Sequence, residues 1–150
     1  MIKLLRTDAN NPDFKELIIL LDAGLAISDG EDHHFYTQFN KTDQIKYVII
    51  AYEDTKAVAC GAIKKYDDHT MEIKRMFTLP ENRGKGLASM ILSELQNWAK
   101  EMEFKRCILE TGIRQTEAIS LYNKTDFIVI PNYGQYEGIE TSICFEKIMV

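Results

Sequence analysis

The chain has 150 residues, of which 45% are hydrophobic and 27% are charged, and its formal net charge is -5 at pH 7. This length and hydrophobic content fit a single globular domain over residues 1–150 and exclude an intrinsically disordered chain. The negative charge argues against a nucleic-acid binder with a broad basic surface, and no apolar run is long enough to span a membrane.

The first half of the chain predicts a strand, two helices and an antiparallel meander. Residues 2–6 form the expected first strand, and a helix begins at Asn11-Pro12. The apolar residues of this helix recur at helical spacing, at Phe14, Leu17, Ile18, Leu21 and Leu25. A loop over 28–34 separates this helix from a short second helix at 35–39. Polar turns then divide the three strands of the meander, at 46–52, 57–66 and 70–79.

A longer amphipathic helix and a parallel crossover follow the meander. The apolar face of this helix is formed by Leu87, Ala88, Ile91, Leu92, Leu95, Trp98 and Met102. Residues 105–111 form the next strand, which should lie parallel to strand 70–79 after a right-handed crossover. A short helix at 115–122 precedes a final pair of strands at 127–130 and 140–147. The sum is an α/β (α+β) fold, with a mixed, mostly antiparallel sheet of about seven strands flanked by about four helices.

The three cysteines, Cys60, Cys107 and Cys144, all lie in predicted strands, and the chain has no Cys-x-x-Cys pair. An odd number of cysteines in such positions predicts buried free thiols, as in a reducing cytoplasm. Residues 1–6 are too few and too charged for a secretory signal. We therefore expect a cytoplasmic protein.

The glycine-rich loop after strand 70–79 is the most informative feature of the chain. It reads Arg83-Gly84-Lys85-Gly86, and its glycines let the backbone approach a ligand closely. The loop leads into a helix N-terminus, where unpaired N–H groups and the positive end of the dipole favour an anion, most often phosphate. Leu87 excludes a Walker A loop, and Ser89 replaces the third glycine of a dinucleotide fingerprint.

The loop matches the pattern Arg-x-x-Gly-x-Ala in full, from Arg83 to Ala88. That pattern, after a strand that ends in Leu79-Pro80, resembles the acyl-CoA-binding motif of the GNAT superfamily of N-acetyltransferases. A second motif of the family is a short helix of the type Asn-x-x-Ala-Ile-x-Leu-Tyr, which is similar to the stretch from Gln115 to Tyr122. The resemblance extends over residues 48–145, about two-thirds of the chain.

Two residues of the second motif depart from the family pattern. Gln115 stands in place of asparagine and keeps a side-chain amide that can bond to the cofactor. Asp126 stands where glycine usually precedes Phe127. Because aspartate tolerates a left-handed turn better than most residues, this change is mild.

The resemblance implies acetyl-CoA as cosubstrate, with no metal. Contacts to its pyrophosphate, mainly through backbone N–H groups, fall on Arg83, Gly84, Lys85, Gly86, Leu87 and Ala88. The pantetheine arm pairs with the motif strand like an extra strand, which implicates Met76, Phe77 and Thr78. The Met76 amide is then the candidate donor to the thioester carbonyl, in a role like that of an oxyanion hole.

The resemblance also suggests two catalytic residues. Tyr122 occupies the position of a general acid for the departing sulfur, whereas the simpler interpretation is an aromatic ring packed on the sheet. Glu72 aligns with the general base of the family's founding histone acetyltransferase. The alternative for Glu72 is a surface glutamate that faces solvent or pairs with Lys64 or Lys74. Glu110 competes for the role of base, although no motif selects it.

The acceptor site is expected to be walled by aromatic residues of two segments, Phe35, Tyr36 and Phe39 in one and Tyr133 and Tyr136 in the other. Nearby Glu31, Asp32 and Glu137 would suit a cationic amine, although scattered core aromatics and a solvated acidic loop explain the same residues. His33-His34 lacks a third ligand at metal-binding spacing, so no metal site is expected.

The leading hypothesis is an acetyl-CoA-dependent N-acetyltransferase. It moves an acetyl group to a primary amine of a small molecule or peptide by direct attack in a ternary complex. One alternative is a non-catalytic acyl-CoA-binding or sensing module, and a weaker one is a nucleotide-binding oxidoreductase. Neither a nucleic acid nor a membrane is expected as a partner, and a homodimer is compatible with the fold.

Overall fold

The computed structural model describes residues 1–29 and 45–149. Seven strands form one mixed sheet in the order β1-β2-β3-β4-β5-β7-β6, and three α-helices lie in the described part of the chain. The elements are β1 (Ile2–Thr7), α1 (Pro12–Asp29), β2 (Tyr47–Glu53), β3 (Lys56–Asp67), β4 (Thr70–Thr78), η2 (Pro80–Asn82), α3 (Leu87–Glu101), β5 (Arg106–Gly112), α4 (Thr116–Lys124), β6 (Ile128–Ile130), η3 (Gly134–Tyr136) and β7 (Ser142–Ile148). The predicted α+β fold is confirmed, and the short helix predicted at 35–39 lies outside the described residues.

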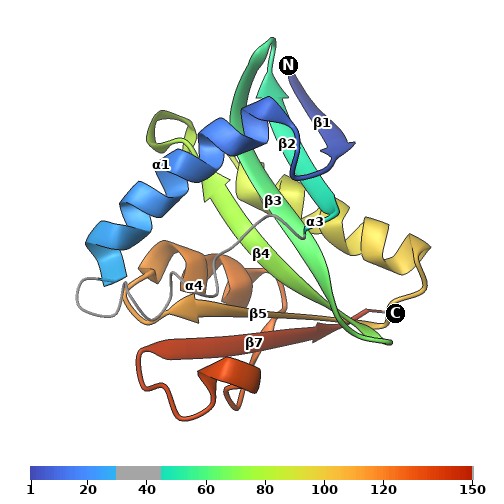
Figure 1. Ribbon diagram of the computed structural model, residues 1–150, viewed down its shortest axis with the longest axis vertical. Coiled ribbons are helices and arrows are strands. Elements are labelled where there is room, and N and C mark those ends of the chain that lie inside the picture. The colour runs from blue at the N-terminus through green and yellow to red at the C-terminus, as the bar shows by residue number, and fades with distance from the viewer. Residues whose placement is uncertain (30–44, 150) are drawn as a thin grey trace.

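The sheet contains the predicted meander and adds the first strand at its edge, beside β2 (Figure 1). β1 to β4 are consecutive antiparallel neighbours, and α3 then carries the chain to β5, which pairs with β4 in parallel. β7 lies between β5 and β6 and is antiparallel to both. The parallel crossover and the final strand pair are therefore both present.

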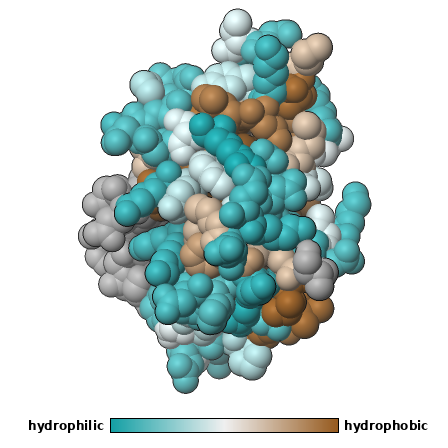
Figure 2. All heavy atoms as spheres, turned by 90° about the vertical axis from the view of Figure 1, so that its right-hand side faces the viewer, coloured by the Kyte–Doolittle hydropathy of each residue, from teal (hydrophilic) through white to brown (hydrophobic). Residues whose placement is uncertain are grey.

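Helices α1 and α3 cover opposite faces of the sheet, with α1 in front and α3 behind in Figure 1. Each buries part of the apolar stripe expected from its periodicity, and the remaining residues of the stripe are partly exposed. The buried helix residues are Phe14, Leu17 and Ile18 of α1 and Leu87, Ile91, Leu92, Leu95 and Ala99 of α3. The side of the molecule near the C-terminal end of α3 is mostly hydrophilic (Figure 2), in keeping with the exposed polar residues Ser93, Asn97 and Lys100 on that helix.

β4 contains a bulge at Arg75, which the sequence analysis did not foresee. Cys60 of β3 pairs with Phe77, whereas Ala62 pairs with Lys74, so β4 holds one residue more than β3 over this stretch. Arg75 has a φ of +56°, in the left-handed region. Gly61 lies opposite the bulge, where an added Cβ would come within 2.5 Å of Met76 Sδ and 2.7 Å of Ile91 Cγ2. The absence of a side chain at Gly61 therefore leaves room for the Met76 side chain beside the bulge.

β4 and β5 separate soon after they meet. In the described part of the chain their pairing is confined to three residue pairs, which end at Glu72 and Ile108. Beyond that point β5 continues to pair with β7 as far as Gly112, whereas β4 continues to Thr78 along β3 only. No described strand therefore pairs with the β5 side of β4 after Glu72, and a wedge opens in the sheet.

The three cysteines are buried and form no disulfide, as predicted. Cys60, Cys107 and Cys144 are each 0% exposed. Among the described helices, none is long and apolar enough to cross a bilayer.

Candidate active site

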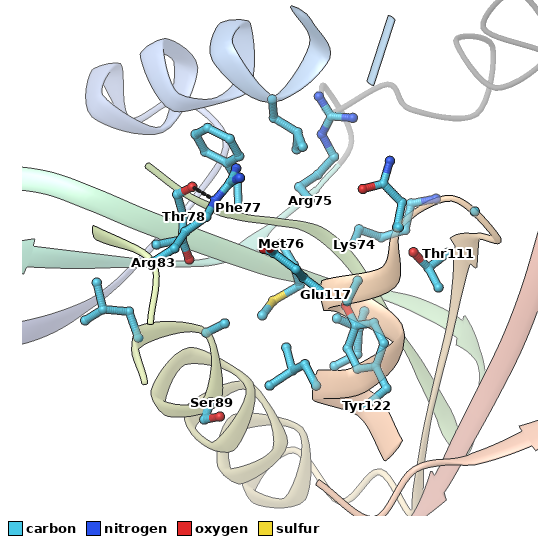
Figure 3. A pocket seen from close by; sticks show the side chains of 18 of the residues that line it. Lys74, Arg75, Met76, Phe77, Thr78, Arg83, Ser89, Thr111, Glu117 and Tyr122 are labelled. Carbon is cyan, nitrogen blue, oxygen red and sulfur yellow. Dashed lines mark hydrogen bonds between the residues drawn. The ribbon is translucent and has the colours of Figure 1, made fainter. Parts of the chain in front are cut away.

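A cavity of about 420 Å³ occupies the wedge between β4 and β5 (Figure 3). Residues 72–78 of β4 form its floor, and residues 110–112 at the end of β5 lie on the other side. The loop before α3 borders one end of the cavity, and residues of α4 complete its wall. The site therefore lies at the carboxyl ends of the two parallel strands, where open sheets bind ligands.

The glycine-rich loop has the geometry of an anion site. Gly84 and Gly86 have φ values of +81° and +79°, a conformation that other residues adopt only with strain. Gly86 is the N-cap of α3, and a glycine has no side chain that could cap the helix end. Among the described residues, the first N–H groups of α3 therefore have neither a helical partner nor an N-cap side chain, and the residues that carry them border the cavity.

Side chains tie this loop to the sheet. Arg83 Nε donates to the Thr78 carbonyl at 3.1 Å, and its guanidinium lies 6.0 Å from the centre of the Phe77 ring. Asn82 Nδ2 donates to the Glu53 carboxylate at 3.1 Å. Lys85 does not line the cavity, and its ammonium lies 3.6 Å from the same Glu53 carboxylate. The phosphate contact expected for Lys85 stays a prediction.

The other predicted cofactor residues border the cavity. They are Met76, Phe77, Thr78, Arg83, Gly84, Gly86, Leu87, Ala88 and Gln115. The bulge turns the Met76 side chain toward Gly61 and α3. The β4 backbone at Met76 faces the wedge, where it has no β5 partner. An extended ligand could pair there as an added strand.

Tyr122 combines a packed ring with an available hydroxyl. It projects from α4 and is 5% exposed, with its ring centre 5.7 Å from those of both Phe127 and Phe145. Its hydroxyl makes no hydrogen bond to a described residue, and Tyr122 lines the cavity. Desolvation, and to a smaller extent the charge of Glu110, raise the Tyr122 pKa above its ordinary value. The phenol is therefore a neutral hydrogen-bond donor at pH 7.

The turn after α4 supports this packing. Asp126 has a φ of +73°, so the left-handed turn that the sequence analysis assigned to this residue is confirmed. The Phe127 N–H donates to the Tyr122 carbonyl at 3.0 Å across this turn. The turn thus places Phe127 against the ring of Tyr122.

Glu72 is buried and lines the cavity, so it is not a solvent-facing strand residue. Its carboxylate accepts a 2.6 Å hydrogen bond from the Tyr133 hydroxyl and lies 3.9 Å from the Lys74 ammonium. Lys64 faces Glu72 in the sheet register. Burial, followed by the charge and hydrogen bond of Glu72, raises the Tyr133 pKa, so Tyr133 remains a donor to the carboxylate.

Glu110 is a second cavity carboxylate, on β5. It accepts a 2.7 Å hydrogen bond from Ser142 Oγ of β7. Its charge raises the pKa of both Tyr122 and Tyr136, although desolvation is the larger cause in each case. The wedge therefore holds two carboxylates, on neighbouring strands and on either side of the space that a ligand would enter.

The predicted aromatic wall is seen only in part. Tyr136 lines the cavity, and Tyr133 packs edge-on against it with ring centres 5.7 Å apart. Phe35, Tyr36, Phe39, Glu31, Asp32 and His33-His34 lie outside the described residues. In the described part of the chain, no group of three or more His, Cys, Asp or Glu side chains could hold a metal ion.

Several lining residues were not predicted from the sequence. They include Leu21 and Leu25 of α1, Lys74 and Arg75 of β4, and Glu117 of α4. Arg75 could have been noticed, because a regular strand would place it on the same face as the buried Ile73. A charged residue at such a position indicates a bulge.

The sequence matches the acetyltransferase (GNAT) family over residues 14–127. It is 33% identical over 109 residues to YjgM, an uncharacterized N-acetyltransferase of Escherichia coli K12, a match that covers 71% of this chain and 64% of that relative. The chain therefore spans somewhat less than two-thirds of the relative's length. A structure from Klebsiella pneumoniae, assigned as an acyl-CoA N-acyltransferase, has a TM-score of 0.85 at 26% identity and covers 100% of this chain and 99% of that one. A GNAT acetyltransferase from Elizabethkingia anophelis with acetyl-CoA bound shares the fold, with a TM-score of 0.69 at 19% identity over 99% of this chain and 98% of that one.

Proposed function

Because this chain belongs to the GNAT family of acetyltransferases, we propose that it is an acetyl-CoA-dependent N-acetyltransferase. It transfers the acetyl group to a primary amine of a small molecule or peptide, by direct attack in a ternary complex. The observation that carries the proposal is the wedge between β4 and β5, which joins the uncapped N-terminus of α3 to the available Tyr122 hydroxyl in one cavity.

The two ends of the wedge suit the two ends of the cofactor. The N–H groups at the start of α3 and the glycine backbone would hold the pyrophosphate. The free edge of β4 from Met76 to Thr78 would pair with the pantetheine arm, and the Met76 N–H would polarise the thioester carbonyl. The structure of the acetyl-CoA-bound protein from Elizabethkingia anophelis supports this ligand for the shared fold.

A carboxylate of the cavity is proposed to accept the proton of the attacking amine. Glu72 is the first candidate and Glu110 the second, since both line the cavity. Tyr122 is proposed to donate a hydrogen bond to the sulfur as the carbon–sulfur bond breaks. Because its pKa is raised, Tyr122 is a weaker acid than free tyrosine, so we expect it to act mainly by hydrogen bonding while solvent completes the protonation of the thiolate.

The oxidoreductase alternative conflicts with the topology of the sheet. A dinucleotide fold requires two parallel strand–helix–strand halves, whereas β4 and β5 are the only parallel neighbours among the described strands. A non-catalytic acyl-CoA-binding module would keep the same wedge. It differs from the proposed enzyme only in the absence of turnover.

Calorimetric titration of acetyl-CoA into the protein, with NADH and ATP as controls, tests the cofactor assignment. We expect saturable binding of acetyl-CoA at one site and none of the controls. The Gly86→Val variant should lose this binding, because a side chain at a φ of +79° strains the loop and blocks backbone approach. Binding of NADH alone, or full affinity in the variant, would contradict the assignment. Release of free CoA in the presence of a primary amine then separates an enzyme from a sensing module.

A further inference from the structure

Arg75 is a buried cation with few partners. Its side chain is only 2% exposed and projects from the bulge of β4. Among the described residues, Nη2 bonds to Asp22 of α1, whereas the buried Nε has no hydrogen-bond partner. Figure 3 shows the guanidinium extending from β4 toward α1, in the wall of the cavity. Most of the five N–H donors of this guanidinium are therefore not used by the described residues.

This arrangement is costly for the protein alone. A buried guanidinium loses its hydration, and a buried donor without a partner adds to that cost. Asp22 offsets only part of it, because its side chain is 49% exposed to water. The left-handed φ of Arg75 adds backbone strain. Strain and incomplete pairing that coincide at a cavity wall indicate that a ligand completes the site.

We propose that Arg75 binds a carboxylate of the acetyl acceptor, and hence that the acceptor is an amino acid or a related amine that bears an acid group. This inference rests on the transferase function proposed above. The planar fork of a guanidinium matches a carboxylate through two parallel N–H···O bonds, which a neutral or cationic group cannot replace. The Nε–H and the remaining Nη hydrogens of Arg75 provide such a fork.

The charges around Arg75 suit a zwitterion. Lys74 and Glu72 alternate with Ile73 along β4 and share a face, as their 3.9 Å contact indicates. Both line the cavity, and Glu110 faces them from β5. An acceptor with its carboxylate on Arg75 and its amine toward the two glutamates pairs each charge with an opposite one. An amine without an acid group leaves Arg75 with Asp22 as its partner among the described residues and brings a further positive charge.

Arg75 is separate from the expected phosphate end of the cavity. Arg83 is tied to the Thr78 carbonyl beside the glycine-rich loop. Arg75 precedes Thr78 by three residues, a separation of about 10 Å along a strand. Its pairing with α1 directs it toward the face of the sheet opposite α3. Loss of the Arg75 charge should therefore affect the acceptor and not acetyl-CoA.

The first test uses the wild-type chain with acetyl-CoA and matched amines. These are the free L-amino acids, their primary carboxamides, the amines that remain after decarboxylation, and the polyamine spermidine. Release of free CoA gives kcat/KM for each. We expect at least one free amino acid to exceed both its carboxamide and its decarboxylated amine by about 10- to 100-fold, the range of a charge-assisted hydrogen-bonded pair. Acetylation of amines without carboxylates, with no preference for any free amino acid, overturns the proposal and leaves the transferase function intact.

Variants then assign the preference to Arg75. Arg75→Gln should raise KM for the preferred amino acid by about 10- to 100-fold and bring its kcat/KM close to that of the carboxamide, with the Kd of acetyl-CoA unchanged. Arg75→Lys keeps the positive charge without the planar guanidinium, so its KM for the preferred amino acid should lie between those of the wild type and Arg75→Gln. Arg6→Gln is the matched control, because Arg6 pairs with Glu94 and Glu101 and does not line the cavity. It should keep the full preference.

Thermal melting followed by circular dichroism shows which variants are folded. If Arg75→Gln does not fold, the comparison rests on Arg75→Lys and on the wild-type panel. An unchanged preference in a folded Arg75 variant overturns the proposal. So does a loss of acetyl-CoA affinity with an unchanged KM for the amino acid, because Arg75 would then serve the cofactor. Failure of the wild-type chain to bind acetyl-CoA at all removes the transferase function and this inference together.

Discussion

The side chain of Tyr122 is divided between the core and the cavity. Its ring belongs to the cluster with Phe127 and Phe145, so the structural interpretation of this residue is correct for the ring. Its hydroxyl makes no hydrogen bond to the described residues. The packing and the proposed catalytic role are therefore compatible, and a change that removes only the oxygen separates them.

Tyr122→Phe should lower kcat by about tenfold or more and leave the Kd of acetyl-CoA nearly unchanged, because only the departing sulfur requires the donor. Steady-state kinetics with thiol detection and calorimetric titration measure the two quantities. Tyr47→Phe serves as the control, since Tyr47 packs against Trp98 and does not line the cavity. An unchanged kcat in Tyr122→Phe would remove this residue from the mechanism.

The two carboxylates of the wedge can be distinguished by isosteric substitution. Glu72→Gln and Glu110→Gln each remove one charge and keep the shape of the side chain. The larger loss of kcat/KM, of about 10²-fold or more, should identify the general base, and we expect it in Glu72→Gln. Losses below about tenfold in both variants would indicate that water accepts the proton instead.

The contact between β3 and the bulge of β4 depends on a glycine. In Gly61→Ala the added Cβ would meet Met76 Sδ at 2.5 Å and Ile91 Cγ2 at 2.7 Å. Overpacking of this kind costs about 1–3 kcal/mol, so we expect a melting temperature lower by about 2–10 °C. Because Met76 must shift, acetyl-CoA should also bind more weakly.

Gly24→Ala is the matched control for this substitution. Gly24 lies in α1, and an added Cβ meets nothing within 4 Å. Alanine is favoured over glycine in a helix by about 0.5–1 kcal/mol, so this variant should melt slightly higher than the wild type. Equal melting temperatures for the two variants would contradict the packing described at Gly61.

Most elements could be predicted because their signals are local. β2 and β3 end at polar turns that contain Asp54 and Asp68. The glycine-rich loop has positive φ values at its two glycines, the residue type that adopts them most readily. The left-handed turn at Asp126 was expected because the family pattern usually has glycine at this position, and aspartate tolerates that conformation. The register of the meander follows from its short turns, which involve only neighbouring residues in the chain.

The bulge and the wedge could not be predicted in the same way, because they depend on contacts between distant segments. The position of Arg75 is set jointly by Gly61, by Asp22 of α1 and by the point at which β5 leaves β4. The sequence identified the glycine-rich loop, but the cavity depends on how far β4 and β5 pair. The proposed role of Arg75 was harder to foresee, since a lone arginine in a strand carries no motif.

The sheet consists of two parts with a narrow connection. β1 to β4 form one part and β5 to β7 the other, and among residues 1–29 and 45–149 three residue pairs of β4 and β5 join them in the sheet. A ligand in the wedge would contact both parts. At about 100 times its Kd, acetyl-CoA should stabilise the fold by about 3 kcal/mol and raise the melting temperature by about 5–10 °C. Hydrogen exchange should slow on both β4 and β5, and protection of β4 alone would contradict a bridging ligand.

The burial of the cysteines has a practical consequence. Desolvation raises the pKa of Cys60 and Cys107 to about 12 and that of Cys144 to about 11. At pH 8 the fraction of each cysteine that is present as the reactive thiolate is then about one in a thousand or less. The native chain should therefore react very slowly with a disulfide reagent that detects thiols. While the protein is native, the colour from such a reagent measures free CoA alone. Each chain that unfolds exposes three further thiols, so the amount of thiol detected per chain distinguishes slow turnover from unfolding of the enzyme.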